Sequence, residues 1–250
     1  KQNIDTRNVI IDDYHFTTLA FVSLSESGER SFSFARRPGA DTQLKKEEIN
    51  LELLKETKIF HFGSLSLTDN PSREATFFAI DNAKAQGAII SYDPNYRKPL
   101  WQSEELAIEY MRMPINKVDI IKISDEECKL ITGEADPYIA VEFLLDYVKI
   151  AVVTLGKDGA IFGFNGVAKQ VEGFKVDKVA DTTGAGDAFW GGFLYSLSSY
   201  QFDSITFEEI EQCVIFGTAT ASLCIEKFGA IPAMPTYEEV ENRLLKLKAD

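Results

Sequence analysis

Residues 181–189 read Asp-Thr-Thr-Gly-Ala-Gly-Asp-Ala-Phe, and an apolar stretch of helical periodicity continues from them to residue 197. A glycine-rich turn that opens a helix presents unpaired backbone N–H groups and the positive end of the helix dipole. Because Gly184 and Gly186 lack side chains, an anion can approach this backbone closely. Asp187 falls in the first turn, where a carboxylate is favourable. The stretch predicts a phosphate-binding helix start or, from glycine spacing alone, a well-capped helix.

Two widespread glycine motifs do not fit this stretch. A P-loop requires Gly-Lys-Ser/Thr, but no lysine follows Gly186. A dinucleotide-binding fingerprint requires a third glycine, and Phe189 stands at that position. The meaning of the stretch therefore depends on the rest of the chain.

Short apolar runs alternate with stretches of helical periodicity along most of the sequence. This alternation predicts an α/β fold with a mostly parallel central sheet covered on both faces. Helix starts are indicated at Asn70-Pro71, with Asn70 as N-cap, and at two capping boxes, Thr206–Glu209 and Thr236–Glu239. The predicted strands cover residues 58–62, 88–92, 118–123, 151–155, 160–164, 168–172 and 174–179.

A β-hairpin is predicted near the beginning of the chain, at about residues 14–37. Residues 16–24 and 31–34 alternate or run apolar, and residues 25–29 between them include a Gly beside a Ser, which is turn chemistry. We expect this hairpin to form a small appended sheet.

Composition excludes several classes of protein. The 250 residues suit one large domain or two small ones, and 45% hydrophobic residues indicate a folded chain. With 26 Lys+Arg against 39 Asp+Glu, the net charge is −13. General nucleic-acid and anionic-membrane binding need clustered cations, so neither is expected. A local cationic pocket for one small anion remains allowed.

The cysteine and histidine counts argue against disulfides and against common zinc sites. Three cysteines without CxxC spacing fit buried thiols in a reducing cytoplasm better than disulfides or zinc. Two histidines exclude an HExxH site. The longest uncharged apolar stretch, residues 150–155, is too short to span a membrane, and no signal-peptide pattern opens the chain.

Taken whole, residues 181–189 closely resemble the signature of the PfkB (ribokinase-like) family of carbohydrate kinases. Residues 93–97, with Leu100 and Trp101, resemble the DPNxR…LW segment of the family's fructokinase branch. The matching stretches follow one another in the same order as in the family, along almost the entire chain. Its other matching stretches are residues 34–36 with 39–41, 122–133, 153–156 with 158–159, and 229–232 with Pro235.

The resemblance implies a ribokinase-like, three-layer α/β/α fold with a small β lid. Residues 1–250 would form a single kinase domain, and the hairpin at about 14–37 would contribute to the lid. Relatives begin with several dozen residues that supply a first strand and part of the sugar site. We therefore expect this chain to lack that N-terminal part.

The implied activity is ATP-dependent phosphorylation of a sugar hydroxyl, with fructose as the first candidate. Two alternatives stay open: a 2-keto-3-deoxygluconate kinase, and a catalytically silent PfkB-like binding or regulatory protein. The resemblance also allows a homodimer that pairs through the β lids. Asp187 matches the family's catalytic base, and the backbone of Gly184, Ala185 and Gly186 would stabilise charge on the transferred group.

Further residues take implied roles at the ion sites. Glu127 matches the acidic position of an NxxE motif associated with Mg²⁺, but Ser124 replaces its Asn, and Ser124 with Glu127 is also a helix capping box. Asp181 and Thr183 match positions that bind a monovalent cation, K⁺, in relatives.

The substrate and nucleotide residues follow from the same matches, each beside a structural alternative. Arg97 can bind a phosphate or sugar oxygen, or it can form a surface ion pair. Asp93 and Asn95 are residue types that also favour turns. Thr154 is a β-branched residue that also suits a strand. The implied substrate-binding residues are Arg36, Asp93, Asn95 and Arg97, and the implied nucleotide-binding residues are Lys122, Ser124, Thr154, Gly156, Gly159 and Thr218.

Overall fold

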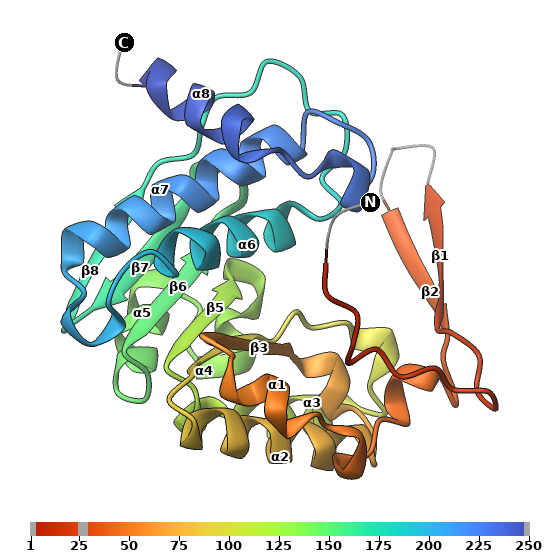
Figure 1. Ribbon diagram of the computed structural model, residues 1–250. Helices are drawn as coiled ribbons and strands as arrows, with labels where there is room; N and C mark the ends of the chain where they lie inside the picture. The colour runs from red at the N-terminus through yellow and green to blue at the C-terminus, as the bar shows by residue number, and fades with distance from the viewer. Residues whose placement is uncertain (1–3, 25–29, 248–250) are drawn as a thin grey trace. The chain divides into compact units, whose positions relative to one another are not determined.

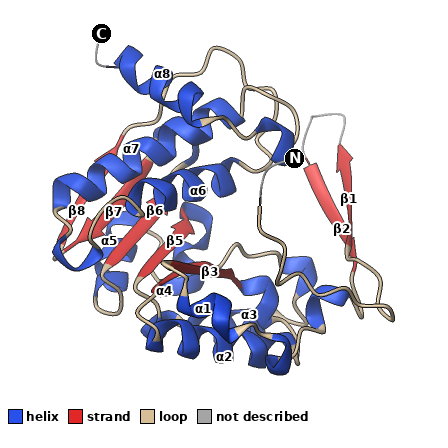
Figure 2. Cartoon of the chain, in the orientation of Figure 1, coloured by secondary structure: helices blue, strands red, loops and turns tan. Residues whose placement is uncertain are grey.

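The computed structural model describes residues 4–24 and 30–247. The chain separates into two compact units, residues 1–119 and 120–250. Most of their helices and strands are labelled in Figure 1, and Figure 2 colours them by type. The predicted turn at residues 25–29 lies outside the described residues.

The first unit combines a hairpin with a parallel strand pair and its helices. Strands β3 and β4 pair in parallel, with Ile59 opposite Ile89 and Gly63 opposite Asp93. The elements are β1 (Leu19–Leu24), β2 (Arg30–Ala35), α1 (Leu51–Lys55), β3 (Ile59–Gly63), α2 (Ser72–Ala85), β4 (Ile89–Asp93) and α3 (Glu104–Arg112).

Helix α2 covers the strand pair with a small-residue face. Ala75, Ile80 and Ala83 are fully buried, and their spacing places them on one side of the helix. The predicted N-cap is wrong: Pro71 occupies that position, and the Asn70 side chain donates to Glu74 at 2.9 Å. The chain already turns before Asn70, because the backbone N–H of residue 73 bonds the carbonyl of residue 69.

The predicted hairpin strands are confirmed. β1 and β2 pair antiparallel as a separate two-stranded sheet, from Leu19 opposite Ala35 to Leu24 opposite Arg30. Leu19 and Phe21 keep about half of their surface exposed, at 51% and 56%. Two-stranded sheets gain little stability alone, so the contacts at the hairpin base matter.

The second unit contains a four-stranded stretch of sheet with helices on both faces. β5 and β6 run parallel, whereas β6, β7 and β8 are successively antiparallel. The elements are β5 (Ile120–Ser124), α4 (Cys128–Thr132), α5 (Pro137–Leu145), β6 (Ile150–Thr154), β7 (Ala160–Phe164), β8 (Val167–Val171), α6 (Ala185–Leu197), α7 (Phe207–Cys224) and α8 (Tyr237–Leu247).

Two successive residues of β7 show how this unit is layered. Side chains alternate across a strand, so Phe162 and Gly163 face opposite sides of the sheet. The Phe162 ring lies 4.8 Å from that of Phe207, at the start of α7. A Cβ at Gly163 would lie 2.3 Å from Val141 of α5. The sheet is therefore sandwiched between α5 and α7, and Gly163 allows α5 to pack closely.

We expect Gly163→Ala to lower the free energy of unfolding by about 1–3 kcal/mol, because the added methyl group overpacks the contact with α5. Gly166→Ala is the matched control. Gly166 lies between β7 and β8, and no atom lies within 4 Å of the methyl group that alanine would add there. Its positive φ of 76° predicts a backbone cost of about 1 kcal/mol without overpacking. Urea denaturation measures both, and a smaller loss in Gly163→Ala than in Gly166→Ala would contradict the packing explanation.

Helices α6 and α7 pack closely because small residues lie between them. A Cβ at Gly192 would meet the Thr220 hydroxyl at 2.4 Å, and one at Gly217 would meet the Phe189 carbonyl at 2.7 Å. Both predicted capping boxes are confirmed: at Thr206–Glu209 and Thr236–Glu239 the backbone and side-chain bonds are formed.

The strand predicted at residues 174–179 is wrong, because this segment has no ladder partner among the described residues. Phe174 instead packs against Ala219, Leu223 and Val240. The segment ends where the backbone N–H of Ala180 donates to the carbonyl of residue 225 at 2.8 Å. Its apolar residues therefore serve side-chain packing rather than a sheet.

The expected buried thiols are confirmed, since Cys128, Cys213 and Cys224 are all buried and unpaired. Burial raises the pKa of Cys128 to about 12 and that of Cys213 to about 11. No helix in the described part of the chain combines the length and apolar character needed to cross a bilayer.

Candidate active site

The glycine-rich stretch forms the N-terminus of α6. Gly184 is the residue that precedes the helix and has φ 82°, a left-handed conformation that glycine adopts without strain. A Cβ at this position would lie 2.8 Å from that of Ala230. Ala185 donates its N–H to the Thr182 carbonyl at 3.2 Å. The N–H groups of Gly184, Gly186 and Asp187 have no acceptor among the described residues, so three donors are available for an anion.

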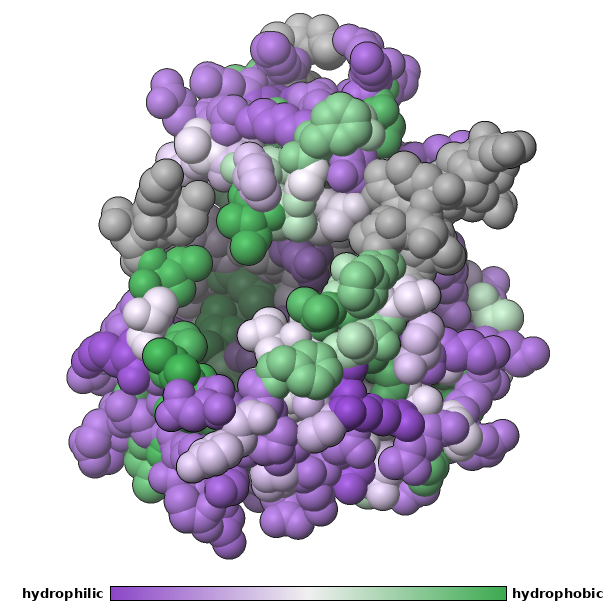
Figure 3. Space-filling model, turned by 90° about the vertical axis from the view of Figure 1, so that its right-hand side faces the viewer, coloured by the Kyte–Doolittle hydropathy of each residue, from purple (hydrophilic) through white to green (hydrophobic). Residues whose placement is uncertain are grey.

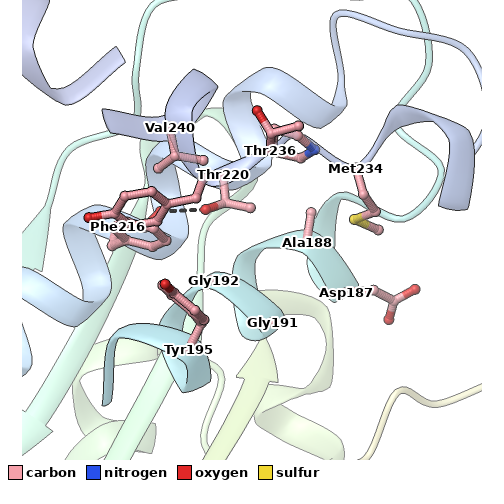
Figure 4. A pocket seen from close by; sticks show the side chains of 12 residues that line it. Asp187, Ala188, Gly191, Gly192, Tyr195, Phe216, Thr220, Met234, Thr236 and Val240 are labelled. Carbon is pink, nitrogen blue, oxygen red and sulfur yellow. Dashed lines mark hydrogen bonds between the residues drawn. The ribbon is translucent and has the colours of Figure 1, made fainter. Parts of the chain in front are cut away.

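Asp187 lies in the first turn of α6 and is exposed. Its carboxylate has no hydrogen bond or ion pair within residues 4–24 and 30–247. Figure 4 shows Asp187 at the edge of a pocket of about 230 Å³, with its carboxylate directed away from the side chains of Phe216 and Tyr195. A carboxylate that the protein leaves unpaired beside free backbone donors is suited to accept a proton from a substrate.

Asp181 holds the turn before α6 in place. Its Oδ1 accepts the N–H of Thr183 at 2.7 Å, and its Oδ2 accepts the N–H of Gly229 at 3.0 Å. One carboxylate thus joins the turn to the segment before α8. Ion pairs of Lys227 with Glu239 and of Arg243 with Glu226, at 2.9 and 2.8 Å, attach that segment to α8.

Lys122 brings a cation to the same helix start. It lies in β5 with only 5% of its surface exposed, and its Nζ lies 3.4 Å from the position that a Cβ would take at Gly186. A buried ammonium group beside free backbone donors strengthens the attraction for phosphate. The structure therefore brings Lys122, Asp187 and the glycine turn together.

The capping box between Ser124 and Glu127 is confirmed. Glu127 Oε2 accepts the Ser124 N–H at 2.8 Å and the Ser124 hydroxyl at 3.1 Å, and Glu127 is 7% exposed. This contact positions the acidic side chain directly after β5. No group of three or more metal-ligating side chains occurs in the described ranges, so these residues do not form a metal cage by themselves.

The turn between β6 and β7 carries three predicted nucleotide residues. The Thr154 hydroxyl donates to the Ile123 carbonyl at 3.4 Å. Gly156 has φ 58° and open space where a Cβ would be, whereas a Cβ at Gly159 would lie 2.0 Å from the Val171 carbonyl. Gly156 therefore leaves room for a ligand, and Gly159 is required by the fold.

Thr218 lies inside the second unit. It is 6% exposed, and its hydroxyl donates to the Val214 carbonyl of its own helix at 2.8 Å. Because this hydroxyl already donates within its own helix, its geometry does not favour the predicted contact with the nucleotide, which stays a prediction.

Three of the predicted substrate residues lie at the end of β4 or just after it. Asp93 ends the strand and is 4% exposed, whereas Arg97 is exposed and donates to the neighbouring Tyr96 carbonyl at 3.0 Å. Asn95 has φ 48°, as expected of a turn former. Ser64, which follows β3, is a further candidate that the sequence did not single out: its hydroxyl is fully buried and has no hydrogen-bond partner among the described residues. The register of Gly63 with Asp93 could have indicated it.

Arg36 uses its guanidinium group to fasten the hairpin base. Its Nε and one terminal nitrogen bond Asp41 Oδ2 at 2.7 and 2.6 Å, and further bonds reach the Thr68 hydroxyl and the Leu65 carbonyl, both at 2.7 Å. Partial burial acts to raise the pKa of Asp41, but hydrogen bonds from Arg36 and Thr18 outweigh it and hold that pKa below its ordinary value. Arg36 is thus engaged by the protein itself, and sugar binding by it stays a prediction.

We expect Arg36→Lys to lower the free energy of unfolding by about 1.5–3 kcal/mol, since lysine cannot reproduce the fork of charged hydrogen bonds. Arg37→Lys is the control, because Arg37 is exposed and makes no hydrogen bond to the described residues. Urea denaturation measures both variants. The loss should be present above the ordinary carboxylate pKa of about 3.9 and should shrink as the pH falls through the lowered pKa of Asp41. A pH-independent loss would contradict the role of this pair.

Comparison with known proteins connects this geometry to a family. The model of the pfkB family carbohydrate kinases matches residues 1–237. The chain belongs to the pfkB family of carbohydrate kinases. It is 41% identical to probable fructokinase-5 of Arabidopsis thaliana over the full chain and 77% of that protein. It is 38% identical to fructokinase-2 of Zea mays, over 98% of this chain and 74% of that protein.

Solved structures show that the similarity to these kinases also holds for the fold. The crystal structure of Vibrio cholerae O395 fructokinase with fructose, ADP and calcium ion is 33% identical. It has a TM-score of 0.87 and covers 96% of this chain and 77% of that one. The ATP-bound fructokinase of Xylella fastidiosa also has a TM-score of 0.87, at 31% identity, and covers 95% of this chain and 76% of that one. The predicted ribokinase-like α/β fold with a mostly parallel sheet is confirmed.

Proposed function

We propose that this pfkB family kinase transfers the γ-phosphoryl group of ATP to a hydroxyl group of fructose. One observation carries the proposal: the unpaired carboxylate of Asp187 follows the free backbone donors of Gly184 and Gly186 in a single helix turn. The Asp187 carboxylate can accept a proton, and the backbone N–H groups can stabilise an anion. Phosphoryl transfer to an alcohol requires both.

Each residue has a defined part in the proposed reaction. The Asp187 carboxylate accepts the proton of the attacking hydroxyl as the oxygen–phosphorus bond forms and the bond to ADP breaks. The N–H groups of the α6 N-terminus and the ammonium group of Lys122 stabilise negative charge on the phosphoryl oxygens. Asp181 keeps these donors in position through its bonds to Thr183 and Gly229.

Cations supplement these groups in the proposal. Mg²⁺ neutralises phosphate charge when it is bound with ATP, and the buried Glu127 is the residue that would face it through water. Asp181 and Thr183 are the candidates for K⁺. Because both Asp181 oxygens accept backbone N–H groups, a cation there would share an already engaged carboxylate.

Fructose is favoured over 2-keto-3-deoxygluconate because the plant relatives and the two bacterial structures named above are fructokinases. On the sugar side we propose Asp93, which ends β4, with Asn95 and Arg97, which follow it, while Arg36 holds the hairpin base. The retained Asp187 argues against a silent, purely regulatory protein.

A cytoplasmic location and a homodimer that pairs through the hairpins complete the proposal. The three buried thiols suit a reducing compartment. The exposed apolar side chains of β1, Leu19 and Phe21, suit contact with a second copy. The face drawn in Figure 3, which is the right-hand side of Figure 1 where the hairpin is drawn, carries apolar side chains among polar ones.

A sugar panel tests the substrate. ADP release with Mg²⁺ and ATP is measured against fructose, glucose, ribose and 2-keto-3-deoxygluconate. We expect the highest kcat/KM with fructose, by at least tenfold. Faster turnover of 2-keto-3-deoxygluconate would replace the proposed substrate, and ADP release that no sugar stimulates would overturn the kinase assignment.

A further inference from the structure

Residues 225–230, here called the connecting segment, follow α7 and are hydrogen-bonded to the chain that leads into the glycine-rich turn. The carbonyl of Ile225 accepts the N–H groups of Ala180 and Asp181, at 2.8 and 3.2 Å. The N–H of Gly229 donates to the Asp181 carboxylate at 3.0 Å. These hydrogen bonds fix the path of the chain directly before the turn.

The connecting segment and the residues after it also contact the start of α6. A Cβ at Gly184 would lie 2.8 Å from the Cβ of Ala230, so the segment limits where the turn can lie. Further along the chain, Met234 lines the same pocket as Asp187, and Figure 4 shows both side chains at one end of it. A shift of the connecting segment would therefore displace the turn and the backbone N–H groups that follow it.

Arg243 of α8 fastens the connecting segment. One terminal nitrogen of its guanidinium group donates to both carboxylate oxygens of Glu226 at 2.8 Å, and the other donates to the Ser222 hydroxyl at 3.3 Å. Glu226 directly follows Ile225, whose carbonyl holds the chain before the turn. The guanidinium group also lies at the C-terminal end of α7, where a cation is favourable.

The environment of Arg243 suits it to this role better than that of the neighbouring ion pair. Partly buried ion pairs are screened less by salt than exposed pairs, which contribute little. The Arg243 and Glu226 side chains are 18% and 34% exposed. Those of Lys227 and Glu239 are 44% and 42% exposed. Val240, three residues before Arg243, is 2% exposed in a core cluster shared with α7, so α8 is a firm support.

We propose that Arg243 is a positioning residue for phosphoryl transfer. Through Glu226 it holds the connecting segment, and the segment holds the turn whose N–H groups stabilise the transferred phosphoryl group. Arg243 makes no hydrogen bond to residues 180–187 in the described part of the chain, so its effect passes through the segment. A displacement of about 1 Å in a positioned group can lower a rate by about 10²-fold. The effect on catalysis rests on the proposed function.

Substitution of Arg243 tests the effect on the reaction. Arg243→Gln should lower kcat at least tenfold and leave the KM for fructose within twofold, because the lost contacts to phosphoryl oxygens are made in the transition state. Arg243→Lys, which can keep one charged bond to Glu226, should recover part of the lost kcat. It also keeps the test available if Arg243→Gln does not fold.

The matched control removes another ion pair of α7. Lys169 of β8 lies 2.7 Å from Glu211 of that helix, and neither residue belongs to the connecting segment. Lys169→Gln should keep kcat within twofold. An equal loss of kcat in Lys169→Gln and Arg243→Gln would show general destabilisation and overturn the positioning role.

A double-mutant cycle tests whether Arg243 acts through Glu226. If the two side chains work as a unit, Arg243→Gln combined with Glu226→Gln should have the same kcat, within twofold, as the more impaired single variant. Independent, multiplicative losses would overturn the proposed route through Glu226.

Amide hydrogen exchange reads the same contact without any catalysis. The N–H groups of Ala180 and Asp181, which bond the Ile225 carbonyl, should exchange at least tenfold faster in Arg243→Gln and at an unchanged rate in Lys169→Gln. Faster exchange supports the structural part of the inference even if the chain phosphorylates no sugar, in which case only the proposed function fails. In an active chain, unchanged exchange or an unchanged kcat in Arg243→Gln overturns the inference.

Discussion

Asp187→Asn should lower kcat with fructose by about 10²–10⁴-fold, which is the usual contribution of a positioned general base. The amide keeps the shape of the side chain but cannot accept the proton of the attacking hydroxyl. Stability should change by less than about 1 kcal/mol, because the Asp187 carboxylate has no partner in the described residues and contributes only its interaction with the helix dipole. Steady-state kinetics and thermal unfolding measure the two effects.

The matched control is Asp203→Asn, another exposed carboxylate of the second unit. It should leave both kcat and stability near those of the unchanged chain. An Asp187→Asn enzyme with more than a tenth of the normal kcat would exclude Asp187 as the base. A large loss of stability would show that the carboxylate is structural instead.

Gly184→Ala should lower kcat by about 10²-fold, similar to the loss of an oxyanion donor in other enzymes. The alanine must either adopt φ near 82° or rebuild the turn, and its methyl group would lie 2.8 Å from the Cβ of Ala230. Either response displaces the N–H groups that follow. The left-handed backbone alone costs about 1–2 kcal/mol, so stability should fall as well.

Gly87→Ala separates strain from catalysis. Gly87 has nearly the same φ, 84°, but no atom within 4 Å of an added Cβ. It should lose a comparable amount of stability while kcat stays within twofold. If both variants reduce kcat equally, general destabilisation rather than displacement of the α6 N-terminus is responsible.

The parts of the fold that depend on local chemistry were predictable from the sequence. The capping boxes at Thr206 and Thr236 form as expected, and Asn165-Gly166 joins β7 to β8 with φ values of 50° and 76°. The α6 start was predictable because glycine and aspartate have strong positional preferences at helix ends.

Features that depend on long-range packing were not predictable in this way. Residues 174–179 have a strand-like composition, but Phe174 finds its partners on α7 and α8. Asn70 is a good N-cap residue, yet the chain turns before it.

Within the site, the residue types in 181–187 indicated a helix start that can bind phosphate, but the sequence could not place Lys122 beside Gly186. Nor could it show that Arg36 and Thr218 use their donors within the protein. Those contacts join residues far apart in the chain or depend on which face of a helix is buried. The roles of the glycine turn and of the individual contacts stay predictions, which the substitutions above test.

The most direct test of phosphoryl transfer to fructose is a ³¹P NMR time course of the chain with Mg²⁺, ATP and fructose. The proposed reaction predicts that the γ-phosphate signal falls while a sugar phosphomonoester signal and the ADP signals rise by equal amounts, and that Asp187→Asn suppresses all three changes. Loss of γ-phosphate to inorganic phosphate alone, or an equal rate in Asp187→Asn, would contradict it.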